Sequence, residues 1–436
     1  MILIYTGKTT NRLRYIFEHI LKYVLGLKVK FTTNIEEFNQ HTGAKINYSS
    51  RAFNPNELFF YASPLLFERR IKPQQLKIEN FEDTKIFFIS KNNSDLPFDI
   101  FAASFYLISR YEEYLPDAQF DQHQRYLPEN SLAYHHNFLQ QPIVDVWIKK
   151  LEKILKNRFP DLAIKRRPYH FTPTYDIDIA YAFSHKGFLR TTAGWLHTLY
   201  KRDFDELNTR MAILKREQTD PYDTYEWQYE LQKKYDLKSI YFFLLGNYGQ
   251  YDKNLPADNL ALHELICYLS DVCPIGIHPS YESNKDIQIV ANEIAKLAQI
   301  VKKEIRRSRQ HYLRLNIPDT YQKLLELDVE KDYTMGYASQ VGFRAGTASS
   351  FYFYDLNLEI KTTLRVYPFA VMDVTLHDYL KLTPQQALQL IEQLINATKA
   401  VDGLFCTVWH NNTLSNYKDW EGWRIVYEET VKMALK

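Results

Sequence analysis

The sequence predicts an α/β protein whose larger part is an incomplete parallel (β/α) barrel of about seven strands. Two observations lead to this prediction. From residue 169 onward, short runs of strand-forming residues alternate with longer segments of helical periodicity, which is typical of repeated βα units and of a parallel sheet. In addition, about seven strands in roughly 270 residues fit a barrel better than a doubly wound sheet, and no glycine-rich phosphate loop follows the first strand.

The order of the elements in this larger part follows from the pattern alone. Strands are expected at Tyr169–Tyr175, Ser239–Leu245, Ile275–His278, His311–Leu315, Tyr333–Gly336, Val366–Met372 and Leu404–Trp409. Helices are expected at Tyr222–Tyr235, Leu260–Val272, Lys285–Ile305, Asp319–Leu327, Pro384–Val401 and Trp420–Leu435. Two prolines, Pro318 and Pro384, stand where first-turn prolines belong.

Residues 1–160 are expected to form a smaller α/β domain, because strand-like and helical segments are mixed there and nothing in them indicates catalysis. The segments are Ile2–Tyr5, Arg12–Leu25, Phe59–Tyr61, Lys85–Ile89, Phe98–Tyr114 and Ile143–Asn157. A polar, proline-containing loop between the last two carries three histidines, which in an exposed loop are more often incidental than metal ligands: His123, His135 and His136. Charge and Pro168 place the domain boundary near residue 160, so that the barrel comprises residues 161–436.

Composition excludes several classes of protein. The formal net charge is +2 with dispersed basic residues, which argues against a nucleic-acid partner. The three cysteines (Cys267, Cys273 and Cys406) lack metal-ligand spacing, and an odd number argues against a disulfide framework. No signal-peptide pattern and no membrane-spanning apolar stretch are recognisable, so a cytoplasmic location is expected. The 33 tyrosines and 27 phenylalanines suit a sugar-binding cleft, although they also fit a simple compositional bias.

The first expected strand of the barrel ends in two aspartates that are one residue apart. Side chains alternate along a strand, so Asp176 and Asp178, in "FTPTYDIDIAYAF", point to the same side. Two like charges held side by side are costly unless a cation or a proton lies between them. The pair therefore predicts a cation-binding or proton-transferring site.

Further polar residues follow the other expected strands. They are His278, Arg309, His311, Arg344, Asp373 and His410. Any one of them alone is more often a cap or a hydrogen-bonded structural group. In a parallel barrel, however, the carboxyl ends of all strands meet at one mouth, where active sites lie. We therefore expect these side chains to converge on one site.

Four motifs resemble those of the polysaccharide deacetylases, the NodB-homology proteins of carbohydrate esterase family four. "TYDIDIA" is similar to their first motif, T-F-D-D, although the second aspartate is displaced by one residue. "IGIHPSYESN" resembles their His-Ser/Thr motif, "GFRAGT" their arginine motif, and "VWHNN" their closing histidine motif. The resemblance extends from about Arg167 to the C-terminus and is strongest for a branch with an extra N-terminal domain.

This resemblance implies a metal-dependent hydrolase that removes N-acetyl or O-acetyl groups from a sugar or polysaccharide, with a divalent metal, zinc being expected. Asp178 and His278 would be metal ligands. The family has a second histidine four residues after the first, where this chain has Glu282. We expect His311 to be the third ligand, with Glu282 as the rival.

The resemblance also implies the catalytic roles. Asp176 would be the general base and His410 the general acid. Arg344 would pair with Asp176 and keep it ionised, and Asp373 would hold either Arg344 or His410. "TLHDYL" is closer in letters to the closing motif, but only the terminal helix follows His410, so His410 is preferred to His377.

Two other functions remain open. A D-x-D pair at a strand end also occurs in glycosyltransferases, but that function would leave the histidines without a role. A non-catalytic carbohydrate-binding relative is the stronger alternative, because the usual second histidine is replaced by Glu282. The sequence specifies neither the sugar nor the acyl group, nor does it exclude a non-sugar amide.

Overall fold

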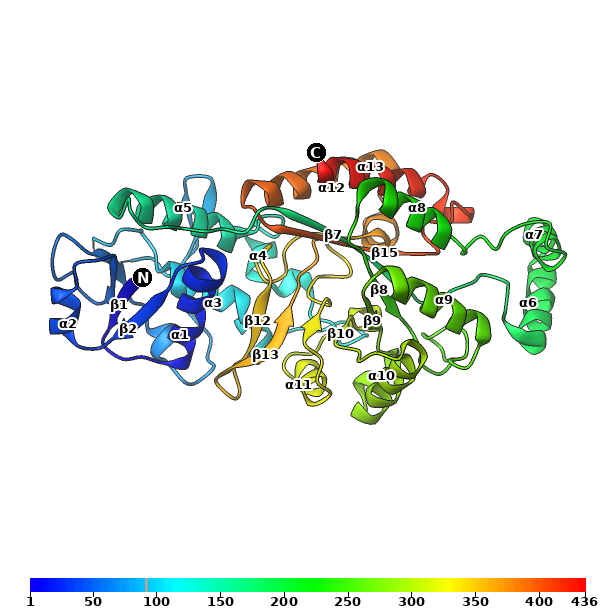
Figure 1. The fold of residues 1–436 in the computed structure, drawn as a ribbon, viewed down its shortest axis with the longest axis horizontal. Coiled ribbons are helices and arrows are strands. Elements are labelled where there is room, and N and C mark those ends of the chain that lie inside the picture. The colour runs from blue at the N-terminus through cyan, green and yellow to red at the C-terminus, as the bar shows by residue number, and fades with distance from the viewer. Residues whose placement is uncertain (91–92) are drawn as a thin grey trace.

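The protein is a mixed α/β structure with two separate parallel sheets (Figure 1), seen in a computed structural model that describes residues 1–90 and 93–436. The N-terminal part lies at one end of the elongated molecule, and helices α6 and α7 lie at the other. Within the described residues, no helix is both long and apolar enough to cross a bilayer.

The N-terminal sheet has four parallel strands in the order β2-β1-β3-β4. They are β1 (Ile2–Thr6), β2 (Val29–Thr32), β3 (Lys45–Ser49) and β4 (Leu58–Tyr61). The expected first helix is present as α1 (Asn11–Phe17) and continues as a π-helix, Glu18–Val24. Thr10 caps α1 by accepting a hydrogen bond from the backbone of Leu13. Strands β2 and β3 are not evident from the sequence.

The N-terminal part has further elements besides this sheet. They are α2 (Ile35–Gln40), β5 (Glu79–Phe81), β6 (Thr84–Ile86), α3 (Ile100–Ile108), α4 (Leu132–His135) and α5 (Ile143–Arg158). Helix α3 begins where Asp99 accepts hydrogen bonds from the backbones of Phe101 and Ala102.

The second sheet has nine strands in the order β12-β13-β11-β10-β9-β8-β7-β15-β14. Every neighbouring pair is parallel except β12 with β13. The strands are β7 (His170–Ile177), β8 (Ile240–Phe243), β9 (Ile275–Ile277), β10 (Arg307–Ser308), β11 (Lys331–Asp332), β12 (Phe351–Asp355), β13 (Ile360–Val366), β14 (Val371–Met372) and β15 (Leu404–His410).

Helices connect most of these strands, as expected from the alternating pattern. They are α6 (Gly187–Lys201), α7 (Phe204–Leu214), α8 (Tyr225–Tyr235), α9 (Leu260–Val272), α10 (Ile287–Val301), α11 (Asp319–Glu326), α12 (Pro384–Ala400) and α13 (Trp423–Leu435). Pro384 occupies the first turn of α12, behind a capping box formed by Thr383 and Gln386. Helices α6 and α7 and the β12–β13 hairpin were not expected from the sequence.

Three expected strands are wrong in position. The segment His311–Leu315 begins as a 3-10 turn, because Tyr312 and Leu313 have φ angles of 58° and 53°, which no strand can contain. Strand β10 ends earlier, at Ser308, and β11 ends at Asp332 instead of running through Tyr333–Gly336. The expected run Val366–Met372 is divided into the end of β13 and β14, on either side of Pro368, which has no backbone N–H for a sheet.

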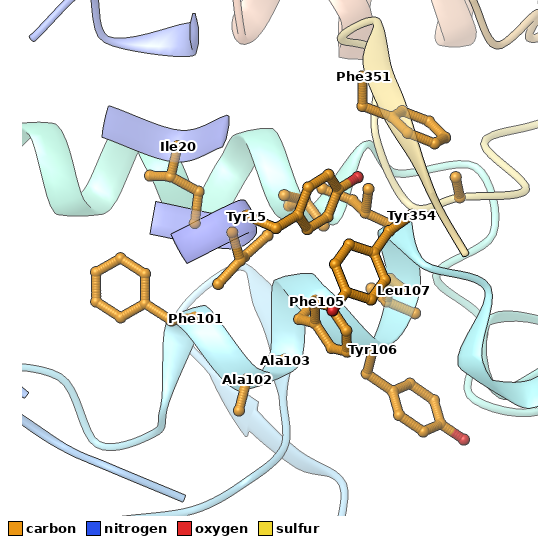
Figure 2. Packing of buried hydrophobic residues seen from close by; sticks show 14 of the residues in the cluster. Tyr15, Ile20, Phe101, Ala102, Ala103, Phe105, Tyr106, Leu107, Phe351 and Tyr354 are labelled. Carbon is orange, nitrogen blue, oxygen red and sulfur yellow. The ribbon is translucent and has the colours of Figure 1, made fainter. Parts of the chain in front are cut away.

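One hydrophobic core joins the N-terminal part to the edge of the nine-stranded sheet (Figure 2). The ring of Tyr15 lies 4.9 Å from that of Tyr354, and Phe105 lies 5.3 Å from the same ring. The Tyr15 hydroxyl donates to the Tyr352 carbonyl at 2.6 Å. Burying three aromatic rings at one seam fixes the N-terminal part against β12.

Candidate functional site

The predicted site residues meet at the carboxyl ends of the parallel strands. Asp176 and Asp178 lie at the end of β7, and His278 follows β9. His311 lies three residues beyond β10, and His410 is the last residue of β15. All five line one pocket of about 440 Å³.

Three of these residues form a cluster that could hold a metal ion. Ligand atoms of Asp178, His278 and His311 all lie within 4.8 Å of one another. Nε2 of His278 is 3.2 Å from Oδ1 of Asp178, and Nε2 of His311 is 3.4 Å from Oδ2. These are the two histidines and the aspartate that the sequence led us to expect as ligands.

The other ring nitrogen of each histidine has an acceptor as its partner. Nδ1 of His278 donates to the Arg309 carbonyl at 2.6 Å, and Nδ1 of His311 donates to Asp252 at 2.7 Å. In the neutral rings, both Nε2 atoms therefore carry lone pairs directed at the Asp178 carboxylate. Moreover, Oδ1 of Asp178 is buried without a hydrogen-bond partner. Converging lone pairs around a carboxylate oxygen without a partner fit a cation. An acceptor on the other ring nitrogen, which orients the imidazole, is typical of metal-bound histidines.

The charges in the cluster also shift the pKa values of His311 and Asp178. Burial lowers the pKa of His311, but Asp178 and Asp252 outweigh it and raise the pKa to about 9. Burial raises the pKa of Asp178, yet His311 and His278 hold it well below its usual range. Without a cation, the cluster balances its charge only by protonating imidazole. A set of one carboxylate and two imidazoles suits zinc and leaves a coordination position for water.

The rival ligand lies elsewhere. The side chain of Glu282 is 53% exposed and pairs with Lys285, and it does not line the pocket. His377, the rival to His410, pairs with Asp378 and packs on Trp420 with ring centroids 4.2 Å apart. Within residues 1–90 and 93–436, Asp178, His278 and His311 form the only potential metal-binding group of three acidic, histidine or cysteine side chains.

Asp176 is held by an arginine, but not by the one expected. Nη1 of Arg309 donates to Oδ1 of Asp176 at 2.7 Å, and both side chains are buried. The expected pairing of Arg344 with Asp176 is wrong. Arg344 instead makes a bidentate ion pair with Glu113, at 2.9 and 2.7 Å. Glu113 belongs to the N-terminal part, and the sequence gives no sign that its buried carboxylate takes this arginine.

His410 is oriented by Asp373, one of the two contacts proposed for that aspartate. Nδ1 of His410 lies 2.9 Å from Oδ1 of Asp373, and its backbone N–H donates to Oδ2 at 2.7 Å. Nε2 is then directed into the pocket, 3.7 Å from Oδ2 of Asp178. Burial lowers the pKa of His410, but Asp373, Asp178 and Asp176 together raise it to about 10.

Two functional residues were not assigned from the sequence. Arg309 was visible as a strand-end residue, but "SRQH" does not show that its side chain reaches back across two strands to β7. Asp252 lies in the loop between β8 and α9, where an acidic residue is unremarkable. Besides holding His311, it accepts the backbone N–H of Tyr281 at 3.0 Å.

The Arg344–Glu113 pair is expected to be structural. Replacing Arg344 by methionine should lower the free energy of unfolding by about 1.5–3 kcal/mol, because Glu113 loses one charged hydrogen-bonding partner and keeps Arg110. Urea unfolding measures this loss, and the exposed Arg306, replaced in the same way, is the control that should change little. A variant as stable as the parent but inactive would instead place Arg344 in the catalytic machinery.

Asp178, His278 and His311, beside the Asp373–His410 pair, form a candidate metal site at the carboxyl end of the parallel sheet. The model of a family of unknown function, DUF7033, matches residues 2–160, which is less than half of the chain. No curated protein matches the sequence.

Solved structures that resemble the chain include several polysaccharide deacetylases. A protein described as a polysaccharide deacetylase from Mycobacterium smegmatis aligns with a TM-score of 0.40 and 12% identity, covering 63% of this chain and 86% of that one. A polysaccharide deacetylase from Bacillus cereus aligns with a TM-score of 0.29 and 12% identity, covering 61% and 87%. A mutant of a family-four pseudoenzyme with restored activity aligns at 0.29 and 9%, covering 61% and 63%. Because these TM-scores are below 0.5, the alignments do not establish a function for this chain.

Proposed function

We propose that the protein is a divalent-metal-dependent hydrolase that removes an N-acetyl or O-acetyl group from a sugar or polysaccharide. The observation that carries this proposal is the cluster of Asp178, His278 and His311, whose free ligand atoms converge at 4.8 Å or less. The four sequence motifs that resemble the polysaccharide deacetylases support the reaction type. Zinc is the proposed metal, since imidazole and carboxylate ligands suit it.

We also infer the organisation of the chain. Residues 161–436 would form an incomplete barrel, which the order of the parallel strands supports. Residues 1–160 would form a separate domain, a division supported by the family match to residues 2–160. The three cysteines are free, which supports the predicted cytoplasmic location.

A bound divalent cation would lower the pKa of a water molecule and polarise the acyl carbonyl. The protein's own groups would move the protons. Asp176, with Oδ1 held by Arg309, is the general base that accepts the proton of the attacking water on its other oxygen. His410, with Nδ1 held by Asp373, delivers a proton from Nε2 to the leaving amine or alcohol.

The pocket wall suits a sugar. Tyr251, Tyr312 and Tyr379 line the pocket beside the metal ligands. Tyrosine combines a flat apolar face with a hydroxyl, so it can stack on a pyranose ring and hydrogen-bond to it. A volume of about 440 Å³ is in the range of small-molecule sites.

Acetate release from N-acetylglucosamine oligomers tests the function. We expect the zinc-loaded protein to release acetate, a chelator to stop the release, and added zinc to restore it. An O-acetylated xylan assayed in parallel distinguishes ester from amide cleavage. A protein that binds these sugars and zinc but releases no acetate would be a non-catalytic carbohydrate-binding relative, and the proposed hydrolase would be wrong.

A further inference from the structure

A loop of the N-terminal part, residues 119–127, contributes Arg125 to the lining of the proposed substrate pocket. Phe120 and Tyr126 make an isolated antiparallel bridge, and the backbone N–H of Leu127 donates to the Gln119 carbonyl at 3.0 Å. Gln124, at the tip, has a φ of 62°, which allows the tight turn. The bridge and the hydrogen bond make this segment a defined hairpin, which we call the 119–127 loop.

The loop is anchored to segments that follow the strands of the large sheet. Arg314 donates from Nε to the His123 carbonyl at 3.0 Å and from Nη2 to the Gln124 side chain at 3.1 Å. Nδ1 of His123 lies 3.0 Å from the Tyr281 hydroxyl, and its ring lies 5.1 Å from that of Tyr312. These contacts hold the 119–127 loop beside Tyr312, the residue after the proposed metal ligand His311.

Arg125 extends from this loop into the pocket. Its Nε donates to Asp121 at 2.6 Å, and Nη2 contacts the same carboxylate oxygen at 2.6 Å. Nη1 donates to the Tyr312 carbonyl at 3.3 Å, and Nη2 also donates to the Tyr379 hydroxyl at 3.2 Å. A guanidinium has five N–H groups, so these contacts leave one on Nη1 for a ligand.

The pocket has a second cation, Lys253, which follows Asp252, the residue that holds His311. Its ammonium group lies 4.8 Å from the centroid of the Tyr248 ring, and among residues 1–90 and 93–436 it has no ion-pair partner within 4.0 Å. The carboxylates that line the pocket each face a cationic or imidazole partner: Asp176 faces Arg309, Asp178 faces His278 and His311, and Asp378 faces His377. Among the described residues that line the pocket, Arg125 and Lys253 are therefore the two with a permanent positive charge.

We propose that the substrate carries an anionic group, a carboxylate or a phosphate, which Arg125 and Lys253 bind. The N-terminal part would then supply part of the substrate site and select acidic over neutral acetylated sugars. A spare guanidinium N–H and an unpaired ammonium, both lining one pocket, are suited to an anion of this kind. This inference rests on the proposed function, because it concerns the pocket that contains the metal cluster.

Equilibrium binding tests the inference without requiring turnover. The probes are N-acetylmuramic acid, N-acetylglucosamine 6-phosphate and neutral N-acetylglucosamine, titrated calorimetrically into the zinc-loaded parent, Arg125→Met and Lys253→Met. We expect at least one acidic probe to bind the parent about tenfold or more tightly than the neutral sugar. Each methionine variant should weaken that probe by roughly 10- to 100-fold, the effect of losing a charged hydrogen bond. Lys253→Met, which removes no contact of the pocket tyrosines Tyr312 and Tyr379, should leave neutral binding unchanged.

The controls separate recognition from folding. Methionine keeps much of the aliphatic stem of either side chain, and Arg125→Lys should recover part of the acidic binding. Lys253→Met alters no contact of the 119–127 loop. If Arg125→Met unfolds, this variant alone shows whether the pocket selects acidic over neutral probes. Equal binding of acidic and neutral probes by the parent overturns the inference, as does equal weakening of all three probes in Lys253→Met. Failure of acetate release with acidic selectivity intact would overturn only the proposed function.

Discussion

Replacing Asp178, His278 or His311 by alanine is expected to abolish tight zinc binding, and acetate release with it. Each change removes one of three protein ligands, and two remaining ligands rarely retain zinc. The direct measurement is the zinc content of each purified variant after dialysis against a weak chelator. The parent should retain about one zinc per chain, and each variant should retain almost none.

Two further variants show whether the ligand assignment is correct. Glu282→Ala is the matched control, because this exposed side chain pairs with Lys285 outside the pocket, and it should retain zinc fully. Asp252→Asn should weaken zinc binding by roughly 10- to 100-fold, the usual effect of changing a group that orients a metal ligand, because Asp252 holds His311 through Nδ1. If Glu282→Ala loses the metal while His311→Ala retains it, the third ligand is Glu282 and the assignment is wrong.

Asp176→Asn is expected to retain zinc but to lose roughly 100- to 10,000-fold in kcat, the usual contribution of a positioned general base. Asparagine keeps an oxygen for the Arg309 hydrogen bond, but it cannot accept a proton from water. His410→Ala should cause a similar loss and remove the limb of the pH–rate profile that reports the general acid. Acetate release at saturating zinc measures both variants.

Asn412→Ala serves as the comparison for these two changes, because Asn412 lines the same pocket without contacting the Asp176–Arg309 or His410–Asp373 pairs. Its effect should be much smaller than that of either variant. Full activity of Asp176→Asn would mean that the base is another group. Loss of zinc in the same variant would make Asp176 a ligand instead.

Much of the nine-stranded sheet could be predicted because its central strands are short, apolar and separated by helices. Strands β7, β8, β9 and β15 and helix α9 appear close to their expected limits. The two-residue strands β10 and β11 were misplaced because so short a pairing leaves no periodicity, and the apolar run after β10 belongs to a left-handed turn at Tyr312. The β12–β13 hairpin is defined mainly by its packing on the N-terminal part, which a local pattern does not reveal.

The site was partly predictable for a similar reason. Strand ends of a parallel sheet lie at one edge, so Asp178, His278 and His311 could be grouped before any distance was known. Their supporting partners could not be grouped in this way. Arg309 and Arg344 are equally plausible partners of Asp176 in sequence, and the choice depends on Glu113, 231 residues before Arg344. The ion-pair partner of a long arginine side chain is determined by tertiary packing, which the local sequence does not show.

The most direct test of the metal centre is anomalous diffraction at the zinc edge from crystals of the zinc-loaded protein. The geometry predicts one strong peak between the Asp178 carboxylate and the Nε2 atoms of His278 and His311, at about 2.0–2.2 Å from each. Asp176 and Nε2 of His410 should lie beside this peak without ligating it. A peak bound by Glu282 or by the histidines of residues 123–136, or no peak at the cluster at full zinc loading, would contradict the proposed metal-dependent hydrolase.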